Sequence, residues 1–285
     1  MARDNLRATR IKPGNADLLT LHVVRREQIS PHFVRVTLGG GDIARFRHMG
    51  FDQWFRLFIP VAEDSLESLS RLPRKLDLLS YAKYLTIAKA MRPVLRNYTV
   101  RAYRPEGPEL DLDVVIHGST ADGSAGPGAT WALSCQAGDP VGLLDEGVGF
   151  NPDPALTRVL LVADESGLPA TAGILASLPQ NTTGQALIEI PSSEDSQQLA
   201  ALPGVELTWL TRTGDHAVPG HAVLEAATAL PPPGEPTYCW VVGEQTLPSA
   251  MRKHWVQAGM PKQDIMFCGY WKASASRARI SDNSG

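Results

Sequence analysis

The spacing of apolar residues changes near residue 150, and this change constrains the fold more than any other feature of the chain. Before it, short stretches alternate apolar and polar residues and end at glycine or proline. The pattern is typical of half-buried antiparallel strands, which we predict at residues 19–24, 33–38, 54–60, 110–118 and 140–144. Regularly spaced short strands favour a small antiparallel β-barrel or sandwich. A stretch rich in Leu, Ala, Lys and Glu at about residues 63–93 predicts a helical insertion.

After residue 154, apolar runs alternate with helix-compatible stretches. Continuous apolar runs are typical of parallel strands that are covered on both faces. We predict such strands at residues 158–163, 186–191, 206–210, 238–243 and 265–271, with helices at 169–178, 222–230 and 246–258. This alternation favours an α/β domain with a parallel sheet. We therefore expect an N-terminal antiparallel β-barrel domain over residues 15–151, an α/β parallel-sheet domain over residues 155–273 and a disordered tail over residues 274–285.

Charge and composition exclude several functional classes. The 27 basic and 30 acidic residues give a formal charge of -3, which gives no support to nucleic-acid binding. No run of about 18 apolar residues is present and the first residues lack a signal-peptide core, so we expect no membrane span. Cys135, Cys239 and Cys268 are far apart and the seven histidines form no ligand motif, so we expect no metal site. We expect a monomer in the cytoplasm.

The predicted strand at residues 96–101 is too polar for a core. Its side chains divide into two faces, with Arg96, Tyr98 and Val100 on one and Asn97, Thr99 and Arg101 on the other. Arginine offers forked donors for phosphate, tyrosine a plane for stacking, and threonine a hydroxyl for ring nitrogens. The strand therefore suits the border of a large, flat, anionic ligand. On these six residues alone, an exposed edge strand held by salt bridges is an equal alternative.

The order Arg-x-Tyr-Thr over residues 96–99 is similar to the flavin signature of the ferredoxin–NADP reductase superfamily. Its extension to Arg101 resembles the siderophore-interacting protein family, which consists of flavin-dependent ferric-siderophore reductases. Further segments are similar to that family in the same order, at residues 114–118, 126–132, 163–170, 209–212, 241–244 and 267–272. The resemblance covers residues 20–272 and implies a ferredoxin reductase-like architecture, in which a β-barrel precedes an α/β domain.

The resemblance implies an FAD site that draws on both domains. Arg96 would meet the pyrophosphate, Tyr98 would stack on the flavin ring, and Thr99 would hydrogen-bond near its reactive edge. Cofactor contacts are also implied for Val100, Arg101, Val115, His117, Gly118, Gly128, Ala129, Thr130, Trp131, Asp164, Glu165 and Ser166.

Two of these segments also have a purely structural explanation. His117 can cap a turn at the end of a barrel strand, and residues 126–132 can form an ordinary Gly/Pro loop. A phosphate-binding loop needs small residues that let backbone amides approach the anion, and residues 126–128 provide them. Ala129 and Thr130 stand where the family often has Ser and Arg. Backbone contacts would survive this departure, whereas one side-chain contact would be lost.

The α/β domain is expected to bind NADH or NADPH as the electron donor, although the glycine triplet of a Rossmann dehydrogenase is absent. Arg212 could hold a phosphate of the nicotinamide cofactor, or it could be a solvated surface arginine. Gly243 lets a cofactor approach the sheet edge, and Arg252 could also face a 2′-phosphate. Glu244 would repel that phosphate and accept a ribose hydroxyl. The balance favours NADH or mixed use.

The iron substrate must arrive already chelated, because the chain has no Cys or His cluster to bind iron. Arg56 stands where the family commonly has Lys, and together with Lys272 it provides the predicted substrate cations. Tyr270 and Trp271 would form an apolar wall beside the flavin. These groups suit a ferric siderophore that is anionic or rich in carbonyl oxygens.

The resulting prediction is NAD(P)H-dependent reduction of ferric siderophores through bound FAD, with release of Fe(II) in the cytoplasm. Its catalytic residues would be Tyr98, Thr99 and Trp271. One alternative is a siderophore-binding carrier without reductase activity. Another is a general flavin or ferredoxin-type reductase.

Overall fold

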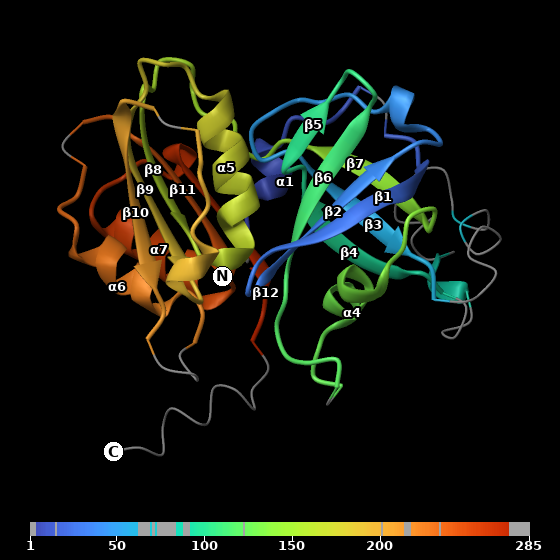
Figure 1. Cartoon of the computed structure of the whole chain (residues 1–285). Helices are drawn as coiled ribbons and strands as arrows, with labels where there is room; N and C mark the ends of the chain where they lie inside the picture. The colour runs from blue at the N-terminus through green and yellow to red at the C-terminus, as the bar shows by residue number, and fades with distance from the viewer. Residues whose placement is uncertain are drawn as a thin grey trace. The chain divides into compact units, whose positions relative to one another are not determined.

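The structure is a computed structural model of the 285-residue chain, and it describes residues 4–14, 16–61, 69, 72, 84–87, 92–121, 123–200, 202–213, 218–233 and 235–273. The chain divides into two compact units (Figure 1). One is Lys12–Val148, and the other joins Met1–Ile11 to Gly149–Gly285. Most of the insertion predicted at about residues 63–93, and the tail predicted at residues 274–285, lie outside the described residues.

The first unit contains a seven-stranded antiparallel sheet in the order β4-β3-β7-β1-β2-β6-β5. Its strands are β1 (Leu19–Ser30), β2 (Phe33–Gly39), β3 (Trp54–Ile59), β4 (Val94–Thr99), β5 (Ala102–Arg104), β6 (Glu109–Val115) and β7 (Pro140–Gly147), with the short helix η1 (Ile43–Arg45) after β2. β4 and β5 lie at opposite ends of this order, yet only two residues separate them in the chain. One continuous segment therefore pairs first with β3 and then with β6, which curls the sheet around its core.

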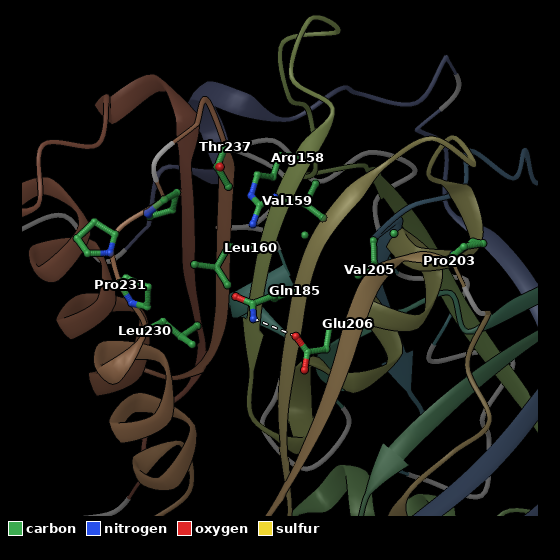
Figure 2. A pocket seen from close by; sticks show the side chains of 14 residues that line it. Arg158, Val159, Leu160, Gln185, Pro203, Val205, Glu206, Leu230, Pro231 and Thr237 are labelled. Carbon is green, nitrogen blue, oxygen red and sulfur yellow. Dashed lines mark hydrogen bonds between the residues drawn. The ribbon is translucent and has the colours of Figure 1, made fainter.

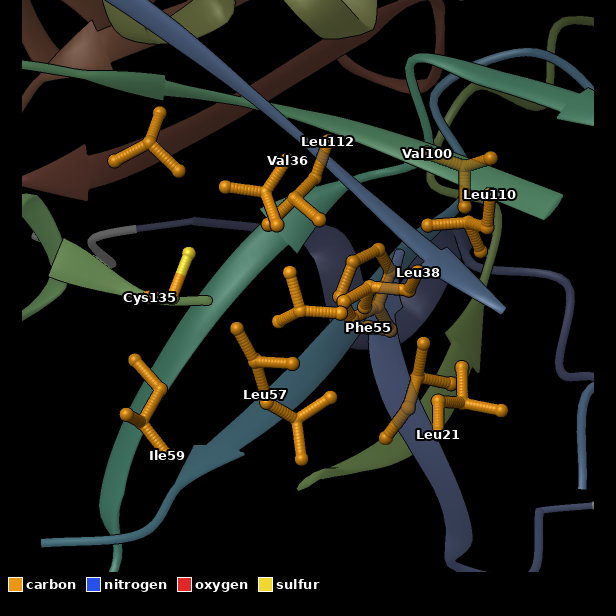
Figure 3. Close-up of a cluster of buried hydrophobic side chains, with 14 of the residues drawn as sticks. Leu21, Val36, Leu38, Phe55, Leu57, Ile59, Val100, Leu110, Leu112 and Cys135 are labelled. Carbon is orange, nitrogen blue, oxygen red and sulfur yellow. The ribbon is translucent and has the colours of Figure 1, made fainter. Parts of the chain in front are cut away.

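Alternation along the strands supplies that core (Figure 3). On β3, Phe55 and Leu57 point inward and are fully buried, whereas Trp54 and Arg56 lie on the other face. Burial of each such side chain contributes roughly 1.5–3 kcal/mol to folding. Helix α4 (Pro127–Ser134) packs against the same core through Ala132. The predicted antiparallel fold of this region is confirmed.

The second unit contains a five-stranded parallel sheet in the order β10-β9-β8-β11-β12. Its strands are β8 (Arg158–Ala163), β9 (Thr183–Ile190), β10 (Gly204–Thr211), β11 (Tyr238–Glu244) and β12 (Ile265–Trp271). The intervening helices are α5 (Leu168–Ser177), α6 (His221–Ala229) and α7 (Thr246–Gln257), with the short helices η2 (Glu165–Gly167), η3 (Ser193–Asp195) and η4 (Lys262–Asp264). α6 and α7 share an apolar cluster with one face of the sheet, and Figure 1 shows α5 on the other face. This confirms the predicted α/β class.

The first residues of the chain belong to the second unit, which the sequence did not predict. Helix α1 (Leu6–Thr9) follows a bridge between Asp4 and Cys268 on β12. Asn5 extends this link, because its Nδ2 donates to the carbonyl of Ile265 (2.8 Å) and its Oδ1 accepts from the amide of Phe267 (3.0 Å). No helix among the described residues is long and apolar enough to cross a membrane.

Candidate active site

In the first unit, the start of helix α4 meets the side chains of β4. A Cβ atom added to Gly128 would lie 2.3 Å from Tyr98 Oη and 3.6 Å from Arg96 Cγ. A side chain at this position would have to displace the Tyr98 hydroxyl, whereas the distance to Arg96 is an ordinary van der Waals contact. Arg96 is exposed, and it makes no ion pair with a residue that the structure describes. The arrangement places a guanidinium and a phenol at a helix N-terminus.

The start of α4 has no side-chain cap, and Pro127 is its first residue. The first amides of such a helix lack intrahelical acceptors, and the helix dipole adds positive potential there. An anion at this position would therefore meet backbone donors as well as Arg96. A phosphate-bearing cofactor fits this donor set. The absent side chain of Gly128 lets the Tyr98 hydroxyl approach the start of the helix.

Tyr98 and Thr99 are held by the same strand but on opposite faces. Tyr98 is half-buried and packs against the core of the first unit, and burial raises the pKa of its phenol to about 12. The phenol therefore stays protonated and can donate a hydrogen bond at any physiological pH. Thr99 is buried, and it pairs with Trp54 across the ladder. Val100 is 2% exposed and is part of the apolar core.

Arg101 lies against a carboxylate of β6. Asp113 accepts from Arg35 at 2.7 and 2.8 Å and lies 3.4 Å from Arg101 Nε. The carboxylate thus holds two guanidinium groups, and Arg101 is part of that ion-pair cluster. This ion-pair cluster does not test the cofactor contact predicted for Arg101, which stays a prediction.

The loop that delivers α4 starts at the end of β6. Val115 pairs with Phe33, and His117 is half-buried. Gly118 has φ +75°, and a Cβ there would lie 2.7 Å from the backbone of Ser124. This loop is therefore folded back on itself and requires glycine. At the start of α4, Ala129 is buried, Thr130 exposed and Trp131 half-buried against the core.

In the second unit, Asp164 ties together the carboxyl ends of three strands. It follows β8 and is fully buried, and its Oδ1 accepts from Ser166 N (2.9 Å) and Ser166 Oγ (2.5 Å). Its Oδ2 accepts from Glu244 N on β11 (2.6 Å) and Trp271 Nε1 on β12 (3.2 Å). A Cβ at Gly243 would lie 2.7 Å from this carboxylate, so glycine is needed there too. The strand order reverses between β8 and β11, and α/β sheets bind ligands at such a point.

Arg212 lies between two buried carboxylates. Its Nε donates to Glu189 Oε1 (2.9 Å), and its Nη2 donates to Glu165 Oε2. Glu189 also accepts from the amides of Gly220 (2.9 Å) and Val223 (3.1 Å) at the start of α6. Burial, with the nearby charge of Asp164, raises the pKa of Glu165 to about 8 against the attraction of Arg212. Arg212 thus links β8, β9 and β10, and it is not a solvated surface residue.

The other residues predicted for the nucleotide also have intramolecular contacts. Glu244 is 3% exposed and caps α7 by accepting from Thr246 N (2.7 Å) and the Thr246 hydroxyl. Its other oxygen accepts from Ala273 N (3.1 Å). Arg252 lies over the ring of Phe267, 4.9 Å from its centroid. These contacts leave neither carboxylate oxygen of Glu244 without a protein donor.

The predicted substrate residues fall in both units. Tyr270 and Lys272 are exposed at the end of β12. Arg56 lies on β3, and its Nε is 2.7 Å from Glu146 Oε1 on the neighbouring strand β7. The sequence did not predict Glu146 as a partner, nor Glu189 as a partner of Arg212. For Glu189 the available signal was a carboxylate inside an apolar stretch of strand, because such a group must be paired.

A cavity of about 540 Å³ lies at the amino ends of β8, β9 and β10, which is the end of the sheet opposite Asp164. Gln185 and Glu206 both line it and are joined by a hydrogen bond of 3.2 Å, and Figure 2 shows them beside each other with Leu230 and Pro231 to their left. None of the residues predicted for cofactor or substrate binding lines this cavity.

An antiparallel sheet followed by a parallel sheet with a switch-point site defines a ferredoxin reductase-like flavoprotein fold. A ferredoxin NADP+ reductase from Neisseria gonorrhoeae with bound FAD and NADP shares this fold, with a TM-score of 0.61 and 15% identity over 90% of this chain and 100% of that one. Residues 22–149 match the siderophore-interacting FAD-binding domain, and residues 156–274 match the siderophore-interacting protein family.

The chain belongs to the siderophore-interacting protein family. A siderophore utilization protein from T. fusca is 30% identical, with a TM-score of 0.74 over 94% of this chain and 97% of that one. The ferric vibriobactin reductase ViuB of Vibrio cholerae is 30% identical over 237 residues, which are 82% of this chain and 81% of that one. The resemblance that the sequence motifs indicated is confirmed.

Proposed function

We propose that the protein reduces ferric siderophores with electrons from NAD(P)H, through bound FAD, and releases Fe(II). The observation that carries the proposal is the meeting of Arg96, Tyr98 and Gly128 at the start of α4, within a domain that matches the family's FAD-binding domain. A relative named ferric vibriobactin reductase supports the choice of substrate. We further propose that the protein is a monomer and acts in the cytoplasm.

The residues present fit FAD in two places. In the first unit, Arg96 and the first amides of α4 would hold the pyrophosphate, with Tyr98 against the ring and Thr99 near its reactive edge. Val115, His117, Gly118, Ala129, Thr130 and Trp131 belong to the strand end, loop and helix that surround this position. In the second unit, Asp164 fixes the loop of Glu165 and Ser166 by accepting from four donors.

FAD held by these residues would supply hydride acceptance from NAD(P)H and single-electron transfer to two ferric chelates. The balance is one NAD(P)H and two Fe(III) giving NAD(P)+, two Fe(II) and one proton. Hard oxygen chelators hold Fe(II) less tightly than Fe(III), so reduction promotes release. The chain's residues therefore bind and orient the reactants, and no side chain needs to act as an acid or base on the iron.

The experiment that tests the proposal follows the flavin spectrum. The purified protein, reconstituted with FAD where necessary, should show the band of oxidised flavin and lose it on anaerobic addition of NADH or NADPH. A ferric trihydroxamate should then restore the band, with two Fe(II) trapped by a coloured Fe(II) chelator for each NAD(P)H consumed. A protein that cannot be loaded with FAD would overturn the proposal.

A second candidate function is a siderophore-binding carrier without reductase activity. The observation that favours it is the first turn of α4, where Ala129 is buried and Thr130 offers a hydroxyl rather than a cation. A carrier would bind ferric chelates but leave the flavin oxidised in the presence of NAD(P)H. A general flavin reductase would instead turn over free flavin and quinones faster than any ferric chelate.

A further inference from the structure

The cavity at the amino ends of β8, β9 and β10 lies where helix α6 ends. α6 stops at Ala229, and Leu230 has extended backbone (φ -67°, ψ 141°). Three prolines follow, and the residue before a proline is kept out of the helical region by the proline ring. Residues 231–233 also lack the amide hydrogen that a helix needs. They therefore leave the helix and line the cavity.

Three polar side chains line this cavity from the face of the sheet that α6 and α7 cover. Leu160 on β8 belongs to the apolar cluster of that face. Arg158 stands two residues before Leu160, so it lies on the same face. Gln185 and Glu206 lie in one row with Leu160 across the parallel ladders, and residues in such a row share a face. All of them line the cavity (Figure 2).

Arg158 is a half-buried cation in this cavity. No described residue accepts a hydrogen bond from it or forms an ion pair with it. A charged group that is partly withdrawn from water needs a partner, and an anion in the cavity would provide one. The prolines at 203 and 231–233 have no amide to offer, so an anion here would depend on the guanidinium.

Glu206 brings the opposite charge on the edge strand β10. Its Oε2 accepts from Gln185 Nε2 (3.2 Å), which is an uncharged donor, and no described cation pairs with it. Arg158 and Glu206 are two strands and two residues apart, which places their Cα atoms about 12 Å from each other. They form no ion pair with one another. The cavity therefore has a positive and a negative group that are separated from each other.

Most of the remaining lining is apolar. Leu160 lies between the two charged residues on the sheet, and Leu230 and the prolines at 203 and 231–233 add hydrocarbon surface around them. The cavity volume of about 540 Å³ falls within the range of roughly 300–1,000 Å³ that small-molecule sites have. Such sites combine apolar walls with a few polar groups that fix the orientation of the ligand.

We propose that this cavity binds a small zwitterion, in which an apolar body separates a carboxylate from an ammonium group. The carboxylate meets Arg158 and the ammonium group meets Glu206. The apolar body lies over Leu160 and beside Leu230. The site is at the end of the sheet opposite Asp164, so it is distinct from the proposed cofactor site. The inference does not depend on the reduction of ferric siderophores.

The test uses 4-(aminomethyl)benzoate, whose ring carries a carboxylate and an ammonium group at opposite ends. 4-Methylbenzoate lacks the ammonium group and 4-methylbenzylamine lacks the carboxylate, whereas the ring is the same. Saturation-transfer NMR titrations at neutral pH and low salt measure the Kd of each probe. Excess FAD is present throughout, so that no probe competes for Arg96. The zwitterion should bind about two- to fivefold more tightly than 4-methylbenzoate, as expected for one added exposed ion pair.

Two variants act on opposite ends of the probe. Arg158→Gln should weaken the binding of the zwitterion and of 4-methylbenzoate by about fivefold or more, because a charge-assisted hydrogen bond is lost. Glu206→Gln should weaken the zwitterion by about two- to fivefold. It should not weaken 4-methylbenzoate, because it removes a like charge. Lys253→Gln and Glu194→Gln are matched controls that remove exposed charges of the same unit outside the cavity, and they should keep the wild-type affinities.

Several results would overturn the inference. One is the absence of saturable binding of the zwitterion up to about 10 mM. Another is equal affinity of the wild-type protein for the three probes, a comparison that needs no variant to fold. A third is an equal effect of Arg158→Gln and Lys253→Gln, since net charge rather than the cavity would then decide. A protein that shows the expected affinities but reduces no ferric chelate would keep this inference and overturn the proposed function.

Discussion

Arginines in the two units have opposite environments, although both were predicted from the sequence to hold cofactor phosphates. Arg96 in the first unit is exposed beside the start of α4 and has no described carboxylate partner. Arg212 in the second unit donates to Glu165 and Glu189, whose side chains are fully buried. The first is available to a ligand, whereas the second holds the protein together. Whether an arginine at a strand end can bind a ligand or stabilises the fold therefore depends on whether neighbouring strands place carboxylates beside it.

Removal of Arg212 should produce the largest effect on stability. Arg212→Ala leaves the Glu189 carboxylate buried without its guanidinium and removes a hydrogen bond to Glu165, and breaking a buried ion pair in this way costs about 3–5 kcal/mol. Denaturant unfolding followed by far-UV circular dichroism measures the loss. Arg252→Ala is the control, because it removes a stacking contact on Phe267 worth about 0.5–1 kcal/mol. If Arg212→Ala lowers the unfolding free energy by less than about 1 kcal/mol, the contacts of Arg212 with Glu165 and Glu189 do not stabilise the unit.

Two buried carboxylates should make stability depend on pH in different ranges. The pKa of Asp145 is raised from 3.8 to about 6, and that of Glu165 from 4.5 to about 8. Both bind their proton more tightly in the folded protein, so the stability they contribute is fully present below the unfolded pKa. It is lost as pH rises to the folded pKa. For Asp145 the loss is at most about 3 kcal/mol, because a pKa difference of one between the folded and unfolded states corresponds to about 1.4 kcal/mol.

Substitution of each carboxylate shows which of the two causes the pH dependence of stability in each range. The difference in unfolding free energy between wild type and Asp145→Asn should fall between about pH 4 and 6 and then level off. The corresponding difference for Glu165→Gln should continue to fall to about pH 8. Urea unfolding at half-unit pH steps provides both curves. A difference that rises with pH in either range would contradict the direction in which burial moves these pKa values.

Replacement of Arg96 should affect the ligand and not the fold. Arg96→Ala removes a charge-assisted hydrogen bond to phosphate worth about 1.5–3 kcal/mol, so the Kd for FAD should rise tenfold or more. Stability without FAD should change by less than about 0.5 kcal/mol, since Arg96 is exposed. Fluorescence titration with FAD measures the first value, with Arg25→Ala as a matched exposed arginine of the same unit. Unchanged FAD affinity would mean that Arg96 does not bind the cofactor.

Much of the fold could be predicted because local patterns decide it. Alternating strands and continuous apolar runs separated the two sheets, and the predicted helix at residues 169–178 differs by one residue from α5 at each end. The attachment of Asn5 to β12 could not be predicted, because the two segments are about 260 residues apart and only two side-chain hydrogen bonds and a bridge record the contact. No local periodicity reports such a contact.

The candidate site likewise contains residues whose positions the sequence could predict and contacts that it could not. Asp164, Glu165 and Ser166 are adjacent in the chain and follow a strand, so their position at the sheet edge could be read directly. The partners of Arg212 and Arg56 could not, because Glu189 and Glu146 reach them across strands. Such ion pairs depend on which strands are neighbours and on their register. Gly128 could be recognised as part of a loop, but its approach to Tyr98 needed the structure.

The smallest expected effect is the difference between NADH and NADPH as electron donors. It concerns both arginines predicted to bind a nucleotide phosphate in the second unit. Arg212 is held by two carboxylates and Arg252 lies on Phe267, so among the described residues neither predicted cation is left for a 2′-phosphate. We expect kcat/KM for NADH and NADPH to agree within about fivefold, a difference below about 1 kcal/mol. Anaerobic flavin reduction by each nucleotide measures the ratio, with Lys253→Gln as the control for loss of a charge from α7. The expectation is wrong if the wild-type protein prefers NADPH more than tenfold. If Arg252→Gln then abolishes this preference and Lys253→Gln keeps it, Arg252 contacts the 2′-phosphate, because only a direct contact would distinguish neighbouring cations on one helix.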